Sequence, residues 1–146
     1  MREKIKLKGI CTIIVRDRNG KILSVERKEN VITDAGREHV AKLLGGLETA
    51  HFSYIQIGRG MTPPSSSDTS LEVYYAEKEA SVSFKGLSSV VFAATFSFSE
   101  SVMISESGIF SGPQETSPVM LCRQVFAGKS MTAGQYLEVV WTIGVA

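Results

Sequence analysis

The sequence predicts a mainly β fold, a single-domain antiparallel β-sandwich or barrel-like fold of about eight strands with one short α-helix at about residues 34–45. Two patterns support this expectation. Apolar and polar residues alternate along several short segments that Gly, Pro, Ser and Thr clusters separate, and one segment alone has helical periodicity. The chain has 146 residues, 43% of them apolar, which suits one domain spanning residues 1–146.

The first expected strand covers residues 4–16, because apolar residues occupy alternate positions there. Ile10 and Ile14 break the polar side of this pattern. Their positions indicate that the second face of the strand is also covered, either by another sheet or by a neighbouring subunit. Residues 17–20 contain Asn-Gly, the usual signal of a type I′ turn, so residues 21–28 are expected to return antiparallel.

The expected helix has a Thr33–Asp34 cap at its start and Gly45–Gly46 at its end. His39 lies beside its apolar stripe, so we expect this side chain at the surface or at the edge of the packed face. The stripe that the i, i+3, i+4, i+7 spacing predicts consists of Val40, Leu43, Leu44 and Leu47.

A long polar loop follows the strand expected at residues 52–57. Gly58-Arg59-Gly60 ends that strand, since glycine reaches backbone angles closed to other residues, and Pro63-Pro64 keeps the chain extended at the surface. A connection of about a dozen residues without regular structure is typical of a functional loop, so we expect it to contact a partner. The later expected strands are residues 80–84, 89–98, 102–110, 119–126 and 136–145.

The residues offer little support for catalysis or for a bound cofactor. His39 and His51 lack nearby ligands at metal-site spacing, and no Gly-x-Ser-x-Gly elbow is present, so neither a metal site nor a serine hydrolase is expected. Glu100, Glu106 and Glu115 are expected to be solvated acids at strand ends. The sequence therefore predicts a protein that is not an enzyme, with no cofactor and no metal.

The charge balance also limits the partners. Sixteen Lys and Arg residues against 15 Asp and Glu give a net charge of +1, which provides no field to gather nucleic acid or anionic lipid. No apolar run reaches the roughly 18 residues that span a bilayer, and the first residues lack the apolar core of a secretory signal. Cys11 and Cys122 lie in apolar strand-like segments and are expected to be reduced core thiols. We expect no nucleic-acid or membrane partner, and synthesis in the cytoplasm.

Four phrases occur in a recognisable order: NVITDAGR at residues 30–37, YIQIGRG at 54–60, PPSSSDTSL at 63–71 and ESGIF at 106–110. This order resembles a group of small tailed-phage and prophage virion proteins, in which N-x-(I/V)-T-x-x-G, I-x-x-G-x-G-T-x-x-P-x-x-x-D-T-x-L and E-x-G-(I/L)-F recur. Met61 stands where the group commonly has glycine or threonine. A Phe-rich strand before ESGIF and a closing LEVVWTI at residues 137–143 belong to the same order, so the resemblance covers residues from about 30 to 146.

The resemblance implies a β-rich, non-catalytic component of the virion, made in the host cytoplasm. Members of the group are head decoration, tail or fibre-associated proteins. A compact domain without a fibre repeat favours a capsid decoration (cement) protein that binds the outside of the head and stabilises it. Such proteins are often trimers, so a homo-oligomer, with a trimer as one form, is expected.

Two alternatives remain open at this point. One is a tail or tail-fibre-associated protein involved in host attachment. The other is a small β-sandwich hydrolase or carbohydrate-binding domain, which would need a cleft with clustered carboxylates or exposed aromatic residues.

The expected contacts to major capsid or tail subunits fall in two segments, the loop at residues 58–71 and the N-terminal segment at residues 1–8, and a homo-oligomer is expected to cover Ile10 and Ile14. Arg59 and Asp68 are the charged anchors that we expect in the loop. Lys4, Lys6 and Lys8 alternate along the first strand, and such a row of lysines more often protects a sheet edge from pairing with another strand. The candidate partner-binding residues are Arg59, Met61, Thr62, Pro63, Pro64 and Asp68 in the loop, and Lys4, Lys6, Lys8, Ile10 and Ile14 in the strand.

Overall fold

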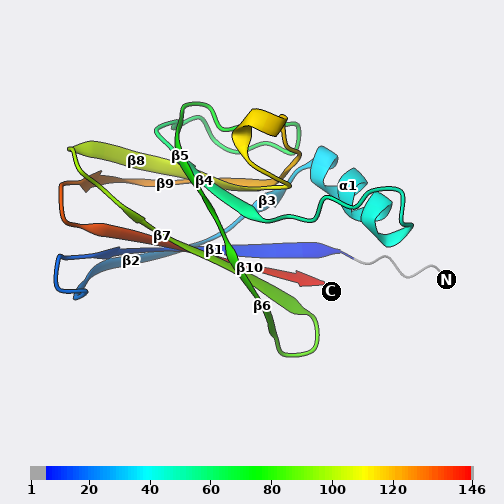
Figure 1. Ribbon diagram of the computed structural model, residues 1–146, viewed down its shortest axis with the longest axis horizontal. Coiled ribbons are helices and arrows are strands. Elements are labelled where there is room, and N and C mark those ends of the chain that lie inside the picture. The colour runs from blue at the N-terminus through cyan, green and yellow to red at the C-terminus, as the bar shows by residue number, and fades with distance from the viewer. Residues whose placement is uncertain (1–5, 146) are drawn as a thin grey trace.

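The computed structural model describes residues 6–145, which form two antiparallel five-stranded sheets packed face to face, with one α-helix at one end (Figure 1). The β-sandwich prediction is therefore confirmed. The barrel-like alternative is not, because within residues 6–145 each sheet keeps two open edges.

The first sheet has the strand order β2-β1-β10-β7-β6. Alternation along the strands divides its side chains between two faces, as expected from the sequence. Cys11, Trp141 and Phe92 lie opposite one another on the core face, whereas Ile14 pairs with Val25 on the outer face. The strands are β1 (Leu7–Arg16), β2 (Ile22–Glu29), β6 (Ser81–Lys85), β7 (Ser89–Ser97) and β10 (Tyr136–Val145).

The second sheet has the order β3-β9-β8-β4-β5. Its strands are β3 (Val31–Ile32), β4 (Tyr54–Gly58), β5 (Tyr74–Glu79), β8 (Val102–Phe110) and β9 (Met120–Met131), and a 3-10 helix, η1 (Gln114–Thr116), joins β8 to β9. The sequence predicts about eight strands because β3 and β5 carry weak signals. β3 is two residues long, and the charged sequence of β5 is typical of an edge strand.

The core between the sheets follows the alternating residues that the sequence singles out. Trp141 is fully buried, and its indole N–H donates to the Ser107 hydroxyl at 3.3 Å. Cys11 and Cys122 are free and buried, which confirms the prediction of reduced core thiols. Other buried core residues are Ile13, Val15, Ile55, Ile57, Phe92, Phe96, Ile104, Ile109, Leu137 and Val139.

Helix α1 (Asp34–Leu44) begins at the predicted cap and ends at Gly45. The Thr33 hydroxyl accepts the Gly36 N–H at 2.9 Å and donates to the Met120 carbonyl at 2.6 Å, so the cap also joins the helix to β9. Gly36 permits the contact, because a Cβ there would lie 2.7 Å from the Leu121 carbonyl oxygen.

The predicted apolar stripe of α1 is wrong at its C-terminal end. Leu44 and Leu47 are 83% and 80% exposed, and the buried residues of the helix are Gly36 and His39. The sequence predicts His39 at the surface or at the edge of the packed face, but the side chain is buried: its ring packs edge-on against Phe52 and its Nε2 lies 2.6 Å from the Ala50 carbonyl oxygen. The segment after the helix folds back over His39, which the helical periodicity does not show.

The β1–β2 turn also differs from the expected type I′ turn. Gly20, with φ of +84°, is the one residue of the turn in the left-handed region. The Asp17 carboxylate accepts the N–H groups of Asn19 and Lys21, each at 2.9 Å. The Asp17 side chain therefore organises a three-residue turn, in place of the two-residue turn that Asn-Gly usually forms.

Candidate functional site

The β4–β5 loop (residues 59–73) is the long loop expected to bind a partner. It lies on the outer side of the second sheet, away from the first sheet (Figure 1). The loop is not simply an extended surface segment, because Gly60 and Leu71 are buried and Ser65 to Asp68 form a turn. Side chains from β8 and β9 fasten it to the sheet.

Glu106, in the middle of β8, is fully buried beneath the β4–β5 loop. Its Oε2 accepts the N–H groups of Gly60 at 2.6 Å and Val73 at 2.8 Å. Its Oε1 accepts the N–H of Glu72 and the Nε–H of Arg123, both at 2.9 Å. One carboxylate thus holds both ends of the loop, and the prediction of a solvated acid at a strand end is wrong for this residue.

Arg123, on the neighbouring strand β9, supplies the charge that balances this buried carboxylate. Its side chain is 3% exposed, and its Nη1 lies 3.2 Å from Asp68 Oδ2. The same Asp68 oxygen accepts the Ser65 N–H at 2.9 Å. Burying a charge is costly unless it is paired and hydrogen-bonded, so Glu106, Arg123 and Asp68 depend on one another. Asp68 therefore anchors the loop to its own sheet, whereas the sequence predicts an anchor to a partner.

Two glycines make room for the Glu106 carboxylate. A Cβ on Gly58 would lie 2.3 Å from the Val73 carbonyl oxygen, and a Cβ on Gly60 would lie 2.5 Å from Glu106 Oε2. Neither glycine has a positive φ. The sequence correctly places a strand end at Gly58-Arg59-Gly60, but close approach of the returning loop and of the buried acid, rather than backbone freedom, explains both glycines.

Glu72 orders the outer part of the loop. Its carboxylate accepts the N–H groups of Met61 at 2.8 Å and Thr62 at 3.1 Å, and also the Thr62 hydroxyl. The hydroxyl and backbone donors stabilise the ionised carboxylate and hold the pKa of Glu72 below its usual value of 4.5. The tip of the loop therefore has a defined shape in the isolated chain.

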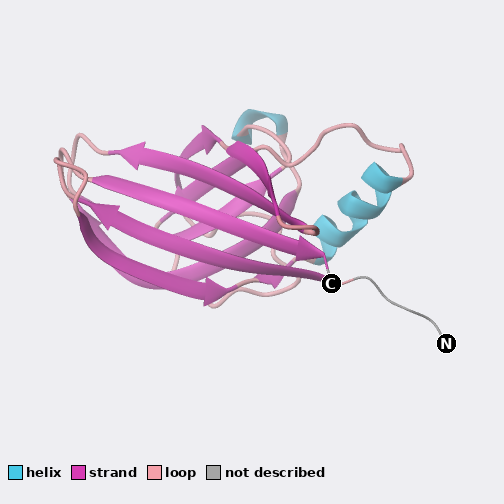
Figure 2. Cartoon of the chain, turned by 90° about the horizontal axis from the view of Figure 1, so that it is seen from below, coloured by secondary structure: helices cyan, strands magenta, loops and turns pink. Residues whose placement is uncertain are grey.

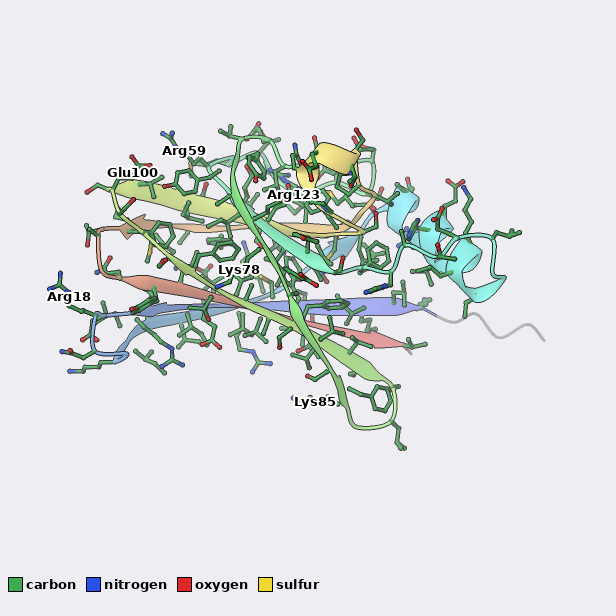
Figure 3. The ribbon with its side chains drawn as sticks, in the orientation of Figure 1. Arg18, Arg59, Lys78, Lys85, Glu100 and Arg123 are labelled. Carbon is green, nitrogen blue, oxygen red and sulfur yellow. The ribbon has the colours of Figure 1, made fainter. Side chains whose placement is uncertain are left out.

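The remaining candidate residues of the loop point toward solvent. Arg59, Thr62 and Pro63 are exposed, Met61 is 63% exposed and Pro64 is half-buried. Figure 3 shows Arg59 directed away from the body of the molecule, whereas Arg123 lies within it. The loop thus presents Met61 and Pro63 to solvent, with the exposed Arg59 and the exposed carboxylate of Glu72 beside them.

The candidate residues of the first strand lie on the other side of the sandwich. Ile10 and Ile14 project from the outer face of the first sheet, which Figure 2 shows from below. Lys6 and Lys8 are exposed, and Lys4 lies outside the described residues. The two groups of predicted partner-binding residues are therefore not brought together, and each belongs to its own surface.

The outer face of the first sheet carries small and β-branched residues across three strands. Ile10 lies beside Thr142 and Val91, and Thr12 lies beside Val140 and Ala93. All these side chains are half-buried. The middle of this face therefore combines apolar side chains with Thr12 and Thr142, and the Arg16–Glu138 ion pair lies further along it.

A cavity of about 270 Å³ opens at the start of β1. Lys8, Ile10, Asn30 and Arg37 are among the residues that line it. Among residues 6–145, no group of three or more His, Cys, Asp or Glu side chains is arranged to hold a metal ion. In the same range, no helix is long and apolar enough to cross a membrane.

Comparison with protein-family models, with curated proteins and with solved structures found no match. The phrases that resemble virion proteins nevertheless share a structural role. The Glu106 carboxylate lies against Gly58 and Gly60, and its ion-pair partner Arg123 also pairs with Asp68. Leu71 packs against Phe110 and Met120, and Thr33 and Gly36 fasten α1 to β9.

Sequence reasoning missed Glu106, Arg123 and Glu72 as the residues that shape the site. Glu106 had a signal, because it opens the ESGIF phrase on which the resemblance rests. Arg123 and Glu72 lie outside the quoted phrases, and their positions in the sequence give no indication that their side chains bind the loop.

Proposed function

We propose that the protein is a non-catalytic virion structural protein, a capsid decoration protein that binds the outside of a phage head and stabilises it. The observation that carries the proposal is the shape of the β4–β5 loop. The buried Glu106 carboxylate binds the backbone N–H groups at both ends of the loop, and the loop presents Met61 and Pro63 to solvent. A loop that is ordered before binding loses little conformational entropy when it docks, so a small contact is sufficient for a specific attachment.

The use of the buried polar groups supports a structural role. Both Glu106 oxygens are occupied by donors of the chain itself. The Ser105 hydroxyl donates to the Gly60 carbonyl, and the Ser107 hydroxyl donates to the Gln56 carbonyl. These acids and hydroxyls hold strands and loop in place, so we propose that none of them acts on a substrate or holds a cofactor.

The outer face of the first sheet provides a second contact area. Ile10, Ile14 and Val140 together form apolar surface on a protein of net charge +1. Apolar surface on a chain with so little net charge favours protein partners over nucleic acid. We propose that this face lies against capsid subunits or against further copies of the chain, with the trimer that the resemblance implies as one such arrangement.

The test uses heads of the phage or prophage that carries the gene, prepared without this protein. Purified protein is added back, and binding and the temperature of DNA release are measured. We expect the protein to bind and to raise the release temperature, and the double variant Met61→Asp and Pro63→Asp to lose both effects. Leu44→Asp is the control, because Leu44 is 83% exposed at the end of α1, which extends past one end of the sandwich (Figure 1).

The same preparation distinguishes the alternative. Wild-type protein that leaves heads unchanged but restores host adsorption would replace decoration with the tail or tail-fibre function. Loop variants that bind heads as tightly as the wild type would remove the proposed role of the β4–β5 loop.

A further inference from the structure

The open edges of the two sheets differ in how they are protected against pairing with another chain. β2 carries the charged run from Glu26 to Glu29, and β5 carries Glu77, Lys78 and Glu79. Lys78 Nζ also donates to the Thr95 carbonyl at 2.8 Å, which ties its side chain across to the first sheet. Charged residues on an edge strand oppose the approach of a second strand, so these two edges are blocked.

The third edge is covered by the chain itself. β3 is two residues long and pairs only with Cys122 and Arg123 of β9. Within residues 6–145, the next residues of β9 have no strand partner on this side, and side chains from β2 bind their backbone groups instead. Lys28 Nζ donates to the Val125 carbonyl at 2.8 Å, and the Glu26 carboxylate accepts the Ala127 N–H at 3.5 Å. Glu26 is also held by Lys129 at 2.7 Å. Backbone groups of β9 with which an incoming strand would have to pair are therefore already hydrogen-bonded to side chains of the same chain.

β6 has none of these protections. Its sequence, SVSFK, contains one charge and no proline, and its pairing with β7 runs without a bulge from Ser81 to Lys85. All five residues are exposed. Val82 and Phe84 are 50% and 70% exposed, although they lie on the core-facing side of the first sheet, opposite Phe92 and Val90. The tip of the β6–β7 hairpin points away from the second sheet, below β1 and β10 in Figure 1, so the second sheet does not cover this side of β6.

The order of residues in β6 is self-complementary in one antiparallel register. If Ser83 lies opposite Ser83 of a second copy, Val82 lies opposite Phe84 of that copy, and Phe84 lies opposite its Val82. Ser81 then lies opposite Lys85, so no like charges face each other. Aromatic and β-branched residues are favourable cross-strand partners, and the four apolar side chains lie on one face of the joined sheet.

We propose that β6 pairs with β6 of a second copy of this chain around a twofold axis at Ser83, which joins the two first sheets into one continuous sheet. The contact is isologous, since the same five residues serve on both sides. It uses neither the β4–β5 loop nor Ile10, Ile14 and Val140 of the outer face. The pairing therefore stands or falls independently of the proposed function.

Disulfide trapping tests the register directly. Ser83→Cys places two thiols opposite each other across the twofold axis, within the Cα separation that a disulfide requires. In Ser81→Cys, the thiol faces Lys85 of the second copy. Both serines are exposed on the same face of β6, and the native Cys11 and Cys122 are buried, so the two variants are matched.

Under mild oxidation of the full-length protein, we expect a disulfide-linked dimer from Ser83→Cys at least about tenfold faster than from Ser81→Cys. Equal rates for the two variants, or no dimer from Ser83→Cys, would overturn the proposal. An equimolar mixture of Ser81→Cys and Lys85→Cys should also form the mixed dimer, as the register requires.

A second measurement needs no new thiol. Sedimentation of the wild type should show a monomer–dimer equilibrium, and Phe84→Lys should weaken dimerisation at least about tenfold by placing a charge in the apolar cluster. Leu87→Lys should leave the equilibrium unchanged, because Leu87 is 98% exposed in the turn beyond the paired strand. Circular dichroism confirms that each variant is folded. Equal weakening by both substitutions, or a wild type that stays monomeric, would contradict the pairing.

Discussion

Replacing the buried Glu106 with glutamine tests the main structural conclusion. The substitution keeps the size of the side chain but removes its charge, and it puts an NH2 group where one carboxylate oxygen now accepts two N–H groups. Whichever oxygen is replaced, two donors lose their acceptor. Arg123 retains only Asp68 as a charged partner.

The expected loss of stability follows from these contacts. Two hydrogen bonds to a charged acceptor, at about 1.5–3 kcal/mol each, give a loss of about 3–6 kcal/mol. Removing one partner of a buried ion pair gives a similar figure, about 3–5 kcal/mol. At about 2–4 °C per kcal/mol for a domain of this size, Glu106→Gln should lower the unfolding temperature by roughly 6–24 °C, a large part of a total stability of about 5–15 kcal/mol.

Urea unfolding followed by fluorescence measures this loss, because Trp141 is the one tryptophan of the chain and is fully buried. Glu115→Gln is the control, since Glu115 is exposed in η1, and its effect should stay within about 0.5 kcal/mol. A loss below about 1 kcal/mol for Glu106→Gln would refute the view that this carboxylate fastens the loop.

Three further outcomes are expected from the same region and core. Gly60→Ala should destabilise the protein by about 1–3 kcal/mol in urea unfolding, because its Cβ would meet the buried carboxylate at 2.5 Å. Cys11 and Cys122 should not react with a thiol reagent at pH 8 until the protein is unfolded, since burial raises the pKa of Cys122 to about 12 and that of Cys11 well above its usual value. Glu72 has a pKa below its usual 4.5, so its contribution is complete above pH 4.5 and is lost as the pH falls through the lowered pKa. Hydrogen exchange should therefore show the two loop amides that Glu72 binds losing protection in acid before the amides of the core strands do.

The phrases that resemble virion proteins illustrate how a pattern can be recognised without its cause. Gly60 and Glu106 stand in separate phrases, 46 residues apart, yet the Gly60 N–H and the Glu106 carboxylate are in direct contact. The order of the phrases is visible in the sequence, but the contact that requires both residues is not. The proposed virion function rests on that order together with the loop that these residues hold.

The sequence by itself determined the mainly β class, the core faces of the strands, the capped helix and the buried thiols, whereas the choice between sandwich and barrel came from the structure. These features depend on periodicity and on neighbours within a few residues, as the alternation that buries Ile13, Leu137 and Trp141 illustrates. The tertiary structure alone decided the burial of Glu106, Arg123 and His39. Each of them is polar and carries no local sign of burial, because the segment that covers it or balances its charge comes from elsewhere in the chain. A polar side chain enters the interior only where distant donors and acceptors meet it, and the fold alone brings those partners together.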